Sequence, residues 1–510
     1  MQLQFRNREL SFLDGVSRES LSGGRLVLLT GKRDTGKTYL AGQHLKKNRG
    51  AYISMAIKSA PTQLADISEY LKSFPFTRDF IPAFRSWREF FLFLFHISRD
   101  EKVNLVIDDF HNFEKTDPEF LAEFASLWKQ YARESRLQLI LITGNQSFLR
   151  KYFGEEGLLK GLVDYSVRLR PVSFTEILKI VSDSGKHVAF NELVKIYLIF
   201  GGMPKYYAMI NRFGLWGKST EEILRALIFS DYAPLGHQIL SGTGEEFTSR
   251  NKIYLSVLQA IAAGKNAVTE IGEHAGIPDT STTKYLNELE HKRGYIKRKV
   301  PLGTADPLRS KTGRYFFRSY FDQFVFRFIQ PDIISYQMGQ YEKMLARVMA
   351  GLDQYIREQF FLIIKRALRD YREHKVVTAL TGSAVALAGE YWTRKVQFDL
   401  GILERNSATM KLCRCYYGEM PDAEAIKQLR HDFEEAVKQS PQMKHELLIH
   451  TEKKPARELI EQLPSGTMVY TTAELRGLLE RLASDEAPKP EQNKKSGAVK
   501  TLRRKKAIKV

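Results

Sequence analysis

Eight consecutive residues near the N-terminus have the types and spacing of a loop that binds phosphate. The pattern GxxxxGK[ST] is matched by Gly31, Lys32, Arg33, Asp34, Thr35, Gly36, Lys37 and Thr38. Its glycines let the backbone curl so that N–H groups face an anion, and a helix N-terminus adds a positive dipole end. In this pattern the lysine reaches the β- and γ-phosphates and the hydroxyl ligates Mg²⁺. We therefore expect the loop to bind ATP, with Lys37 on the phosphates and Thr38 on the metal.

The segments around this loop support that interpretation. An apolar run at residues 25–30 (RLVLLT) precedes it, and a helical pattern at 38–47 (TYLAGQHLKK) follows it. A phosphate-binding loop requires a strand before it and a helix after it. The order of strand, loop and helix therefore favours a nucleotide site over a chance glycine turn.

Two acidic residues, Asp108 and Asp109, end another apolar run at residues 103–109. A carboxylate at such a strand end can hold Mg²⁺, usually through water, so we assign Asp108 to the metal. Asp109 stands where an ATPase commonly has a Glu that polarises the attacking water, which makes it the candidate catalytic base. Asp is one methylene shorter than Glu, and this shift away from near-attack geometry predicts slow hydrolysis. The alternative, that Asp109 is not a base, stays open.

A third strand end carries polar residues that can contact the γ-phosphate. Asn145 and Ser147 follow the apolar run at 137–143 (LQLILIT). We assign Asn145 as the sensor of the γ-phosphate. The alternative is that these residues only cap the next helix, a position at which both types are favoured.

The pattern along the chain predicts several domains. Short β-rich runs alternate with helix-length segments up to residue 171, which is typical of an α/β fold with a parallel sheet covered by helices. The expected organisation is a P-loop ATPase core (1–171), a helical lid (172–245), a winged helix-turn-helix (246–335), an α/β nuclease-like domain (345–485) and a basic disordered tail (486–510). Within the lid, the turn at 201–204 (GGMP) should separate two helices.

Two regions beyond the lid have more specific patterns. Residues 250–294 predict three short helices, the third with Thr280 or Ser281 as N-cap, followed by a basic strand in YIKRKVPLG (295–303) and a return strand in RYFFRSYF (314–321). The last domain predicts a helix at 351–370 and then strands at 376–380, 396–403, 410–417, 445–450 and 466–472.

The winged unit also suggests a partner. In DNA-binding winged helices the third helix enters the major groove and the wing contacts phosphates. The candidate nucleic-acid-binding residues are Thr282, Lys284, Lys297, Arg298 and Lys299. The formal net charge of +19 favours duplex DNA or another polyanion as a partner. The alternative is a winged helix that serves only as a structural joint.

Composition sets the expected environment. The two cysteines, Cys413 and Cys415, are one residue apart and cannot staple a fold, which predicts a reduced, intracellular protein. Neither a secretory signal pattern nor a run of about 18 apolar residues occurs, so we expect a cytoplasmic protein with no membrane partner. The sequence leaves the oligomeric state open.

The motifs resemble those of the archaeal-type ATPases of the STAND branch of AAA+ proteins, over about residues 5–480. Residues 5–10 (FRNREL) resemble that family's F-x-x-R-E-x-E-L element, and the strand end Asp108-Asp109 replaces its usual DE. Residues 201–207 (GGMPKYY) are similar to its GGxPxY element. The resemblance implies that Pro204 contacts the nucleotide from the lid, with a plain interhelical turn as the alternative.

The resemblance has a departure in the core. Many members carry Gly-Arg ahead of the final core strand, where this chain has Gly161-Leu162. An arginine that senses the γ-phosphate is then missing unless Arg168 or Arg170 substitutes. Losing a transition-state arginine can cost ~10³–10⁵ in rate, so the resemblance also implies slow hydrolysis.

The C-terminal domain departs further from the family's nuclease-like domain. The pattern G-x-x-W…E-[IV]-D…E-x-K binds Mg²⁺ through its acids and steadies water or phosphate with its lysine. Residues 389–392 (GEYW) and Asp399 are present, but Gln397, Arg414 and Tyr416 replace the other three groups. Because one carboxylate cannot hold a catalytic metal without help, the resemblance implies a folded remnant without nuclease activity.

Two functional hypotheses follow. In the first, the protein is a switch that slowly hydrolyses ATP to ADP and phosphate, and its nucleotide state sets the angle between core, lid and winged helix. In the second, it is a DNA-binding regulatory protein that uses ATP only as a structural ligand. Both need the same loop, so the sequence does not separate them. A third, an ATP-gated nuclease, is opposed by Gln397, Arg414 and Tyr416.

Overall fold

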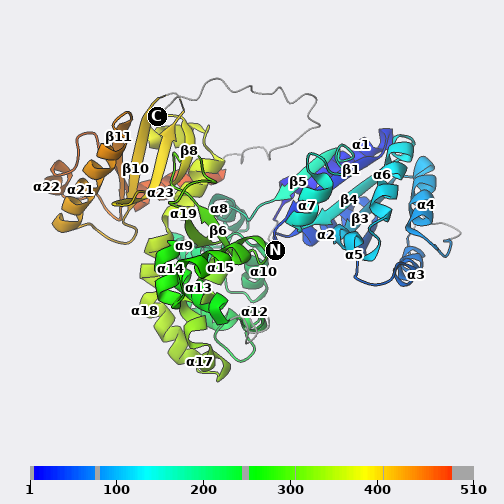
Figure 1. Ribbon diagram of the computed structural model, residues 1–510, viewed down its shortest axis with the longest axis horizontal. Helices are drawn as coiled ribbons and strands as arrows, with labels where there is room; N and C mark the ends of the chain where they lie inside the picture. The colour runs from blue at the N-terminus through cyan, green and yellow to red at the C-terminus, as the bar shows by residue number, and fades with distance from the viewer. Residues whose placement is uncertain (1–4, 75–80, 244–251, 305, 406, 485–510) are drawn as a thin grey trace. The chain divides into compact units, whose positions relative to one another are not determined.

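The computed structural model describes residues 5–74, 81–243, 252–304, 306–405 and 407–484. The predicted tail at 486–510 lies outside the described residues. The chain divides into two compact units (Figure 1). The P-loop unit contains Gln4–Pro171 with Met203–Lys205, and the C-terminal unit contains Val172–Gly202 with Tyr206–Pro488.

A five-stranded parallel sheet in the order β2-β3-β4-β1-β5 forms the centre of the P-loop unit. The strands are β1 (Arg25–Gly31), β2 (Ala51–Ser54), β3 (Val103–Asp108), β4 (Leu137–Thr143) and β5 (Tyr165–Leu169). All five lie in the runs that the sequence predicts, and the expected α/β fold is confirmed. Because β4 lies between β1 and β3, the carboxyl ends of these three strands meet at one edge.

The two faces of this sheet bury different cores. Helices α1 (Asn7–Glu19) and α2 (Lys37–Asn48) cover one face with mostly aliphatic side chains. Helices α3 (Ala60–Leu71), α4 (Trp87–Asp100) and α6 (Phe120–Tyr131) cover the other, with α5 (Phe113–Thr116) and α7 (Gln146–Phe153) beside them. The second face is rich in rings, and those of Phe91 and Phe124 lie 5.2 Å apart near the perpendicular arrangement that aromatic pairs prefer. The unit is a three-layer α/β/α sandwich.

The C-terminal unit begins with helices, as predicted for the lid. They are α8 (Phe174–Asp183), α9 (Phe190–Phe200), α10 (Pro204–Arg212), α11 (Thr220–Leu227) and α12 (Gly236–Thr243). Capping boxes start α8 and α11, in which Ser173 pairs with Glu176 and Ser219 with Glu222. Each box satisfies two backbone donors at a helix start, which fixes where these helices begin.

The predicted turn between α9 and α10 is confirmed, and each of its two glycines is required for a different structural reason. Gly201 has a positive φ of 65°, a backbone conformation that residues with a side chain rarely adopt. A Cβ on Gly202 would lie 1.8 Å from the carbonyl oxygen of Val172, whose N–H donates to the Gly202 carbonyl at 2.7 Å. Only glycine allows the chain to approach Val172 this closely.

Three helices and a two-stranded antiparallel sheet follow in the order expected of a winged helix-turn-helix. They are α13 (Lys252–Ala262), α14 (Val268–Ala275), α15 (Asp279–His291), β6 (Ile296–Lys299) and β7 (Arg314–Phe317). We call this segment the winged module. The expected N-cap of α15 was wrong: Pro278 occupies that position in extended conformation, and Thr280 and Ser281 lie in the first turn.

The next segment corrects two predictions. The helix expected at 351–370 is a longer one, α18 (Tyr341–Gln359), and a second, α19 (Phe361–Asp370), which meet at the fully buried Phe360. The strand expected at 376–380 is helix α20 (Lys375–Thr381), capped by the His374 Nδ1 that accepts from the N–H of Val376. Short helices α16 (Tyr320–Phe324) and α17 (Ile333–Gln337) precede them.

A second five-stranded sheet, in the order β12-β11-β10-β9-β8, forms the mixed α/β end of the chain. Its strands are β8 (Val385–Trp392), β9 (Gln397–Glu404), β10 (Thr409–Cys415), β11 (Lys444–Thr451) and β12 (Met468–Thr471). The first three are antiparallel, and β10, β11 and β12 are parallel, with α21 (Ala423–Gln439) between β10 and β11 and α22 (Arg457–Glu461) before β12. The sequence predicted four of these strands and missed β8.

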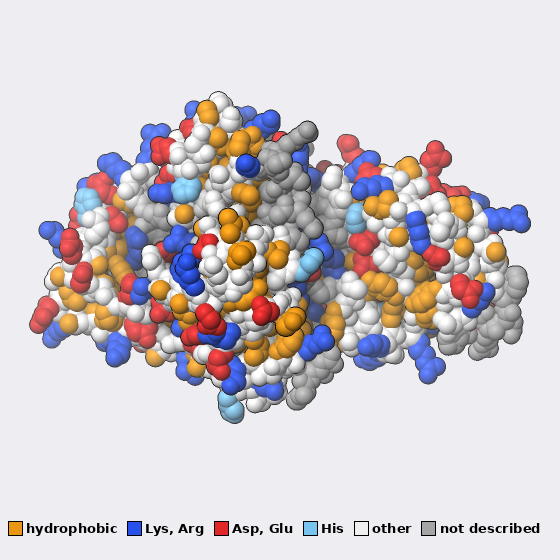
Figure 2. Space-filling view, turned by 90° about the horizontal axis from the view of Figure 1, so that it is seen from below, with side chains coloured by type: hydrophobic (Ala, Val, Ile, Leu, Met, Phe, Trp, Pro, Cys, Tyr) orange, Lys and Arg blue, Asp and Glu red, His pale blue; other side chains and the backbone are white. Residues whose placement is uncertain are grey.

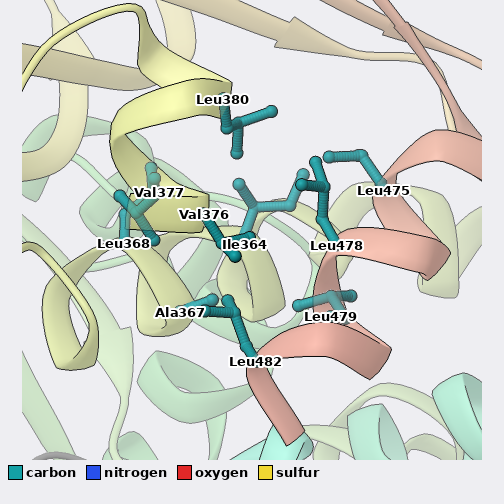
Figure 3. Close-up of a pocket in the computed structure, with 10 residues that line it drawn as sticks. All are labelled: Ile364, Ala367, Leu368, Val376, Val377, Leu380, Leu475, Leu478, Leu479 and Leu482. Atoms are coloured by element: carbon teal, nitrogen blue, oxygen red, sulfur yellow. The ribbon is translucent and has the colours of Figure 1, made fainter. Parts of the chain in front are cut away.

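Helix α23 (Thr472–Ser484) packs between helices from the start of the C-terminal unit and helices close to its mixed sheet. It packs against lid helix α8 and also against α20. Ten apolar side chains from α19, α20 and α23 point toward one another around a cavity of about 20 Å³ (Figure 3). A space of this size without polar partners is a packing seam rather than a ligand site. Within the described ranges, none of the helices has the length and apolar character needed to cross a bilayer.

Replacing Gly202 by Ala should destabilise the C-terminal unit by about 3 kcal/mol, because the new methyl overlaps the Val172 carbonyl. Urea unfolding followed by circular dichroism measures the change. Gly477→Ala is the matched control, since Gly477 lies inside α23 with open space around a Cβ. That variant should gain about 0.5–1 kcal/mol. Equal stability of the two variants would contradict the assignment of Gly202 to a close contact.

Candidate nucleotide and metal site

The predicted phosphate loop connects β1 to α2 at the carboxyl edge of the sheet. Gly36 takes a left-handed conformation at the N-cap of α2, with φ of 88°. A Cβ on Gly31 would lie 2.7 Å from the carbonyl oxygen of Leu169 and 2.8 Å from Oγ1 of Thr35. The Thr35 hydroxyl is fully buried and donates to the carbonyl of Lys32 at 2.8 Å. The two motif glycines are therefore required by the path of the loop.

Lys37 folds back over this loop. Its Nζ donates to the carbonyl oxygens of Gly31 at 3.1 Å and Lys32 at 2.8 Å. Burial lowers the pKa of Lys37, while the negative charges of Asp108, Asp109 and Asp34 act in the opposite direction. A phosphate at the loop would offer the ammonium charge-assisted bonds that are stronger than those to carbonyls.

The carboxylate of Asp108 is the centre of the polar cluster beside the loop. Thr38 Oγ1 donates to Asp108 Oδ2 at 3.0 Å, across 70 residues of sequence. The Tyr52 hydroxyl donates to the same oxygen, and the N–H of Asp109 donates to Oδ1 at 2.7 Å. The structure thus brings together Thr38 and Asp108, the two residues predicted to hold the metal.

Tyr52 belongs to this cluster but has no signal in the sequence motifs. It lies on β2, where it pairs in register with Val106 of the neighbouring β3. Burial raises the pKa of the Tyr52 hydroxyl well above its ordinary value, and its bond to Asp108 acts in the same direction. The hydroxyl is therefore a proton donor to Asp108 at any ordinary pH.

Asp109 lies at the end of β3 with an exposed side chain. Its backbone is left-handed, with φ of 52°, a conformation that costs energy for residues other than glycine. Its charge raises the pKa of Lys37, so the carboxylate lies near the loop lysine. Strained backbone is common at functional sites, which suits a residue held beside a reacting phosphate. Its role as a base stays a prediction.

Asn145 lies beside the loop but is engaged in a helix cap. Its Oδ1 accepts from the N–H of Phe148 at 3.0 Å, which makes it the N-cap of α7. The preceding Gly144 is close to the loop, since a Cβ there would lie 3.8 Å from Lys37 Nζ. The capping alternative is therefore observed, while contact of Asn145 with a γ-phosphate stays a prediction.

Pro204 and its neighbour lie against the same loop. A Cβ on Gly36 would lie 3.8 Å from Cγ of Pro204, and the Nζ of Lys205 is 2.5 Å from Oδ2 of Asp34. Both residues cluster with the P-loop unit although they begin α10. Pro204 is thus placed next to the predicted phosphate site, and its contact with a nucleotide stays a prediction.

Arg6 is a second residue that sequence reasoning missed. Its side chain is only 6% exposed, and its Nη2 donates to the carbonyl oxygens of Thr35 at 3.1 Å and Arg170 at 2.5 Å. One guanidinium therefore ties the start of α1, the phosphate loop and the end of β5. Arg6 lies within the segment FRNREL, but the arginine of the family element F-x-x-R-E-x-E-L corresponds to Arg8. The other candidate arginines, Arg168 and Arg170, have exposed side chains.

The residues predicted to bind nucleic acid are not all on the surface. Thr282 is fully buried, and its hydroxyl donates to the carbonyl of Pro278 at 3.0 Å, so its assignment as a DNA contact was wrong. Lys284 and Lys297 are exposed. Consecutive residues of a helix point in different directions, so Thr282 can turn inward while its neighbours Thr283 and Lys284 face solvent.

Arg298 and Lys299 are also used within the protein. The guanidinium of Arg298 donates to the carbonyl oxygens of Pro307 at 3.0 Å and Ser310. The Lys299 side chain is 16% exposed, forms an ion pair with Glu390 and lies 4.1 Å from the ring centre of Phe316. Both cations thus have partners within the protein, and their expected role in contacting phosphates stays a prediction.

Glu390 is the acceptor that joins the wing to the mixed sheet. Burial alone would raise the pKa of its carboxyl, but Lys365 and Lys299 together lower the pKa to about 2. Burial lowers the pKa of Lys365 to about 8. The backbone carbonyl of Glu390 also accepts from the N–H of Leu302 at 2.9 Å. The loop after β6 thus docks on the edge strand β8.

Asp399, Gln397 and Arg414, which the resemblance aligns with the nuclease pattern, lie close together in the same sheet. Asp399 is buried, which raises the pKa of its carboxyl, and Oδ2 accepts from the N–H of Cys415 at 2.7 Å. Arg414 Nη2 donates to the carbonyl of Gln397 at 2.5 Å, and Arg314 Nη1 donates to its Oε1 at 2.6 Å. Over the described part of the chain, no group of three or more His, Cys, Asp or Glu side chains is placed to hold a metal ion.

Replacing Glu390 by Gln should lower the free energy of unfolding by about 3 kcal/mol, because two buried lysines lose their shared counter-charge. Urea unfolding at pH 7 measures the loss. Adding Lys365→Met should recover part of it. Glu373→Gln is a control, since its ion pair with Arg405 is exposed and should matter little.

The pH dependence of stability checks the same cluster. Because the folded-state pKa of Glu390 is about 2, below the ordinary 4.5, its stabilisation is complete above pH 4.5 and is lost as the pH falls toward 2. Glu390→Gln should therefore lack this part of the acid loss. Identical acid profiles for the two proteins would contradict the role of Glu390.

Comparisons with known proteins found a family model and a relative of this chain. Residues 325–428 match the family model DUF234, described as archaeal and bacterial proteins of unknown function. An uncharacterized protein of Methanocaldococcus jannaschii is 24% identical over 402 residues, which are 79% of this chain and 84% of that protein.

Solved structures with similar folds include two archaeal proteins. The Walker-type ATPase PABY2304 of Pyrococcus abyssi has a TM-score of 0.45 and 21% identity, over 64% of this chain and 96% of that one. The ORC2 protein of Aeropyrum pernix has a TM-score of 0.43 and 14% identity, over 66% of this chain and 96% of that one. By its strand order and its phosphate-loop motif, this chain resembles the archaeal-type P-loop ATPases.

Proposed function

We propose that the protein binds ATP with Mg²⁺ at the phosphate loop and acts as a slowly hydrolysing, nucleotide-dependent switch. One observation carries the proposal. The hydroxyl of Thr38 and the carboxylate of Asp108 meet at 3.0 Å beside Lys37, although they are 70 residues apart. A hydroxyl and a carboxylate next to a loop lysine are the ligand set that P-loop proteins use for a metal-bound triphosphate.

The residues present fit such a ligand. The loop from Gly31 to Thr38 contains two glycines, which have no Cβ, so its backbone N–H groups can approach phosphate oxygens. Lys37 supplies the positive charge, and Thr38 and Asp108 hold the cation, directly and through water. Bound Mg²⁺ would neutralise charge on the β- and γ-phosphates. The geometry favours ATP binding over a loop that is only structural.

Slow hydrolysis follows from the groups around the phosphate end. Asp109 is the candidate base, and its carboxylate is one methylene shorter than that of Glu. The buried guanidinium of Arg6 donates to the carbonyls of Thr35 and Arg170, so it is committed to the protein. Arg168 and Arg170 are the remaining candidates for a charge on the γ-phosphate, with Asn145 as the neutral sensor. A site without an arginine on the γ-phosphate hydrolyses ATP slowly.

The switch involves the C-terminal unit as a whole. The lid is joined to the mixed sheet by the Tyr417 hydroxyl, which donates to Asn191 Oδ1 at 2.9 Å, and by the packing of α23 on α8. The winged module is joined to the same sheet through Lys299 and Glu390. These contacts support movement of lid and winged module together, in place of the separate angles expected from the sequence.

Lys37→Ala should lose nucleotide binding by at least about 100-fold, since it removes the loop's charge on the β- and γ-phosphates. Asp109→Asn should bind normally and hydrolyse more slowly. Titration with a fluorescent ATP analogue and single-turnover hydrolysis, each with and without duplex DNA, separate the two effects. Lys46→Ala, in the last turn of α2, is the charge-matched control. Unchanged affinity in Lys37→Ala would place the site elsewhere.

A second candidate function, binding of duplex DNA, is supported by one face of α15. Exposed polar side chains recur there at helical spacing: Thr280, Thr283, Lys284, Asn287 and His291. Lys297 at the start of the wing is also exposed. Figure 2 shows basic and acidic side chains mixed over the face in view, so a local stripe is a better candidate than a broad basic patch. Such a stripe suits major-groove docking.

Replacing Lys284 and Asn287 by Ala should weaken binding to duplex DNA and reduce any preference between sequences, because base contacts specify sequence. Lys427→Ala, on α21, removes an exposed charge elsewhere and should leave that preference unchanged. Fluorescence anisotropy over a salt series measures both. If the full-length protein binds no DNA at low salt with ATP present, the winged module is a structural joint and the second hypothesis from the sequence also fails.

A further inference from the structure

The hydroxyl of Tyr52 makes a contact that the ordinary P-loop motifs do not contain. Tyr52 lies on β2, the strand beside β3, and two residues later Ser54 pairs in register with Asp108. This register lets the tyrosine ring extend along the edge of the sheet toward the end of β3. Its hydroxyl donates to Oδ2 of Asp108, the oxygen that also accepts from Thr38.

The acceptor positions of Asp108 are nearly filled by protein donors. A carboxylate has about four lone-pair sites, two on each oxygen. Among the contacts of the described residues, Oδ2 accepts from Thr38 and Tyr52, and Oδ1 accepts from the N–H of Asp109. About one site therefore remains, on Oδ1. A carboxylate held in this way cannot rotate freely and has room for one further donor.

We propose that Tyr52 is a positioning residue of the metal site, which holds Asp108 so that its remaining acceptor site receives a water of hydrated Mg²⁺. The proposal rests on the proposed binding of ATP with Mg²⁺ at this loop. Mg²⁺ dehydrates reluctantly and keeps several waters, so a fixed outer carboxylate suits it. Tyr52 acts through Asp108 and not on the nucleotide itself.

An open pocket lies on the α2 side of Thr38 and Tyr52. Its volume is about 370 Å³, enough for several waters. The pocket is lined by Thr38, Gly42, Leu45, Lys46, Gly50, Tyr52 and Tyr70. Two of the donors to Asp108, Thr38 and Tyr52, thus face water on the pocket side.

Tyr52→Phe removes only the hydroxyl and keeps the ring, which packs against the aliphatic core between the sheet and helices α1 and α2. Affinity for a fluorescent ATP analogue would be measured over a Mg²⁺ series and in EDTA. The Mg²⁺ concentration that gives half-maximal binding should rise about five- to tenfold, as expected for losing a hydrogen bond to a charged group. Affinity in EDTA should stay within about twofold, since no phosphate contact is lost.

Tyr70→Phe is the matched control. Its hydroxyl lines the same pocket and accepts from the N–H of Tyr52 at 3.3 Å, but within the described part of the chain it has no hydrogen bond to Asp108. Its Mg²⁺ dependence should equal that of the wild type. Thermal unfolding of each variant checks that the fold is kept.

Two results would overturn the inference. An unchanged Mg²⁺ dependence in Tyr52→Phe means that Asp108 is held well enough without the hydroxyl. An equal loss of affinity with Mg²⁺ and in EDTA means that the hydroxyl supports the fold of the loop and not the metal. Failure of the wild-type protein to bind the analogue at all overturns the proposed function itself, which separates the two failures.

Discussion

The need to compensate one buried carboxylate constrains the arrangement of the P-loop unit. Asp108 is 8% exposed, and a charge in that position is tolerated only when donors surround it. Those donors come from three elements: the first turn of α2, strand β2 and the backbone after β3. Each must hold its register for the carboxylate to be satisfied, so the position of the phosphate loop is fixed by the same contacts that hold the candidate metal ligands Thr38 and Asp108.

The sequence predicted the local parts of this site and missed those made by tertiary proximity. The five core strands and the loop were legible because apolar runs and the glycine pattern are local signals. Tyr52 and Arg6 were not, since their roles depend on contacts with residues 56 and 29 positions away. The run at 376–380 is β-branched and looked like a strand, but its side chains pack at helical spacing between α19 and α23. Tertiary packing overrode propensity there.

The nucleic-acid residues show a different limit of sequence reasoning. A basic run such as Lys297, Arg298 and Lys299 is usually a solvated surface, and the sequence has no sign of what a neighbouring domain will supply. In the folded chain Lys299 forms an ion pair with Glu390, and Arg298 donates to two loop carbonyls. What remains for an outside partner is the exposed stripe on α15, whereas Thr282 on the same helix is buried.

Two glycines of the mixed sheet have a consequence for how sequence motifs are interpreted. A Cβ on Gly389 would lie 3.4 Å from Leu302, and one on Gly401 would lie 3.0 Å from it. The first belongs to the GEYW segment that resembles a nuclease signature, yet its neighbour is a leucine from the wing. Close packing against the wing is therefore a sufficient reason for a glycine at this position, whatever chemistry the surrounding motif suggests.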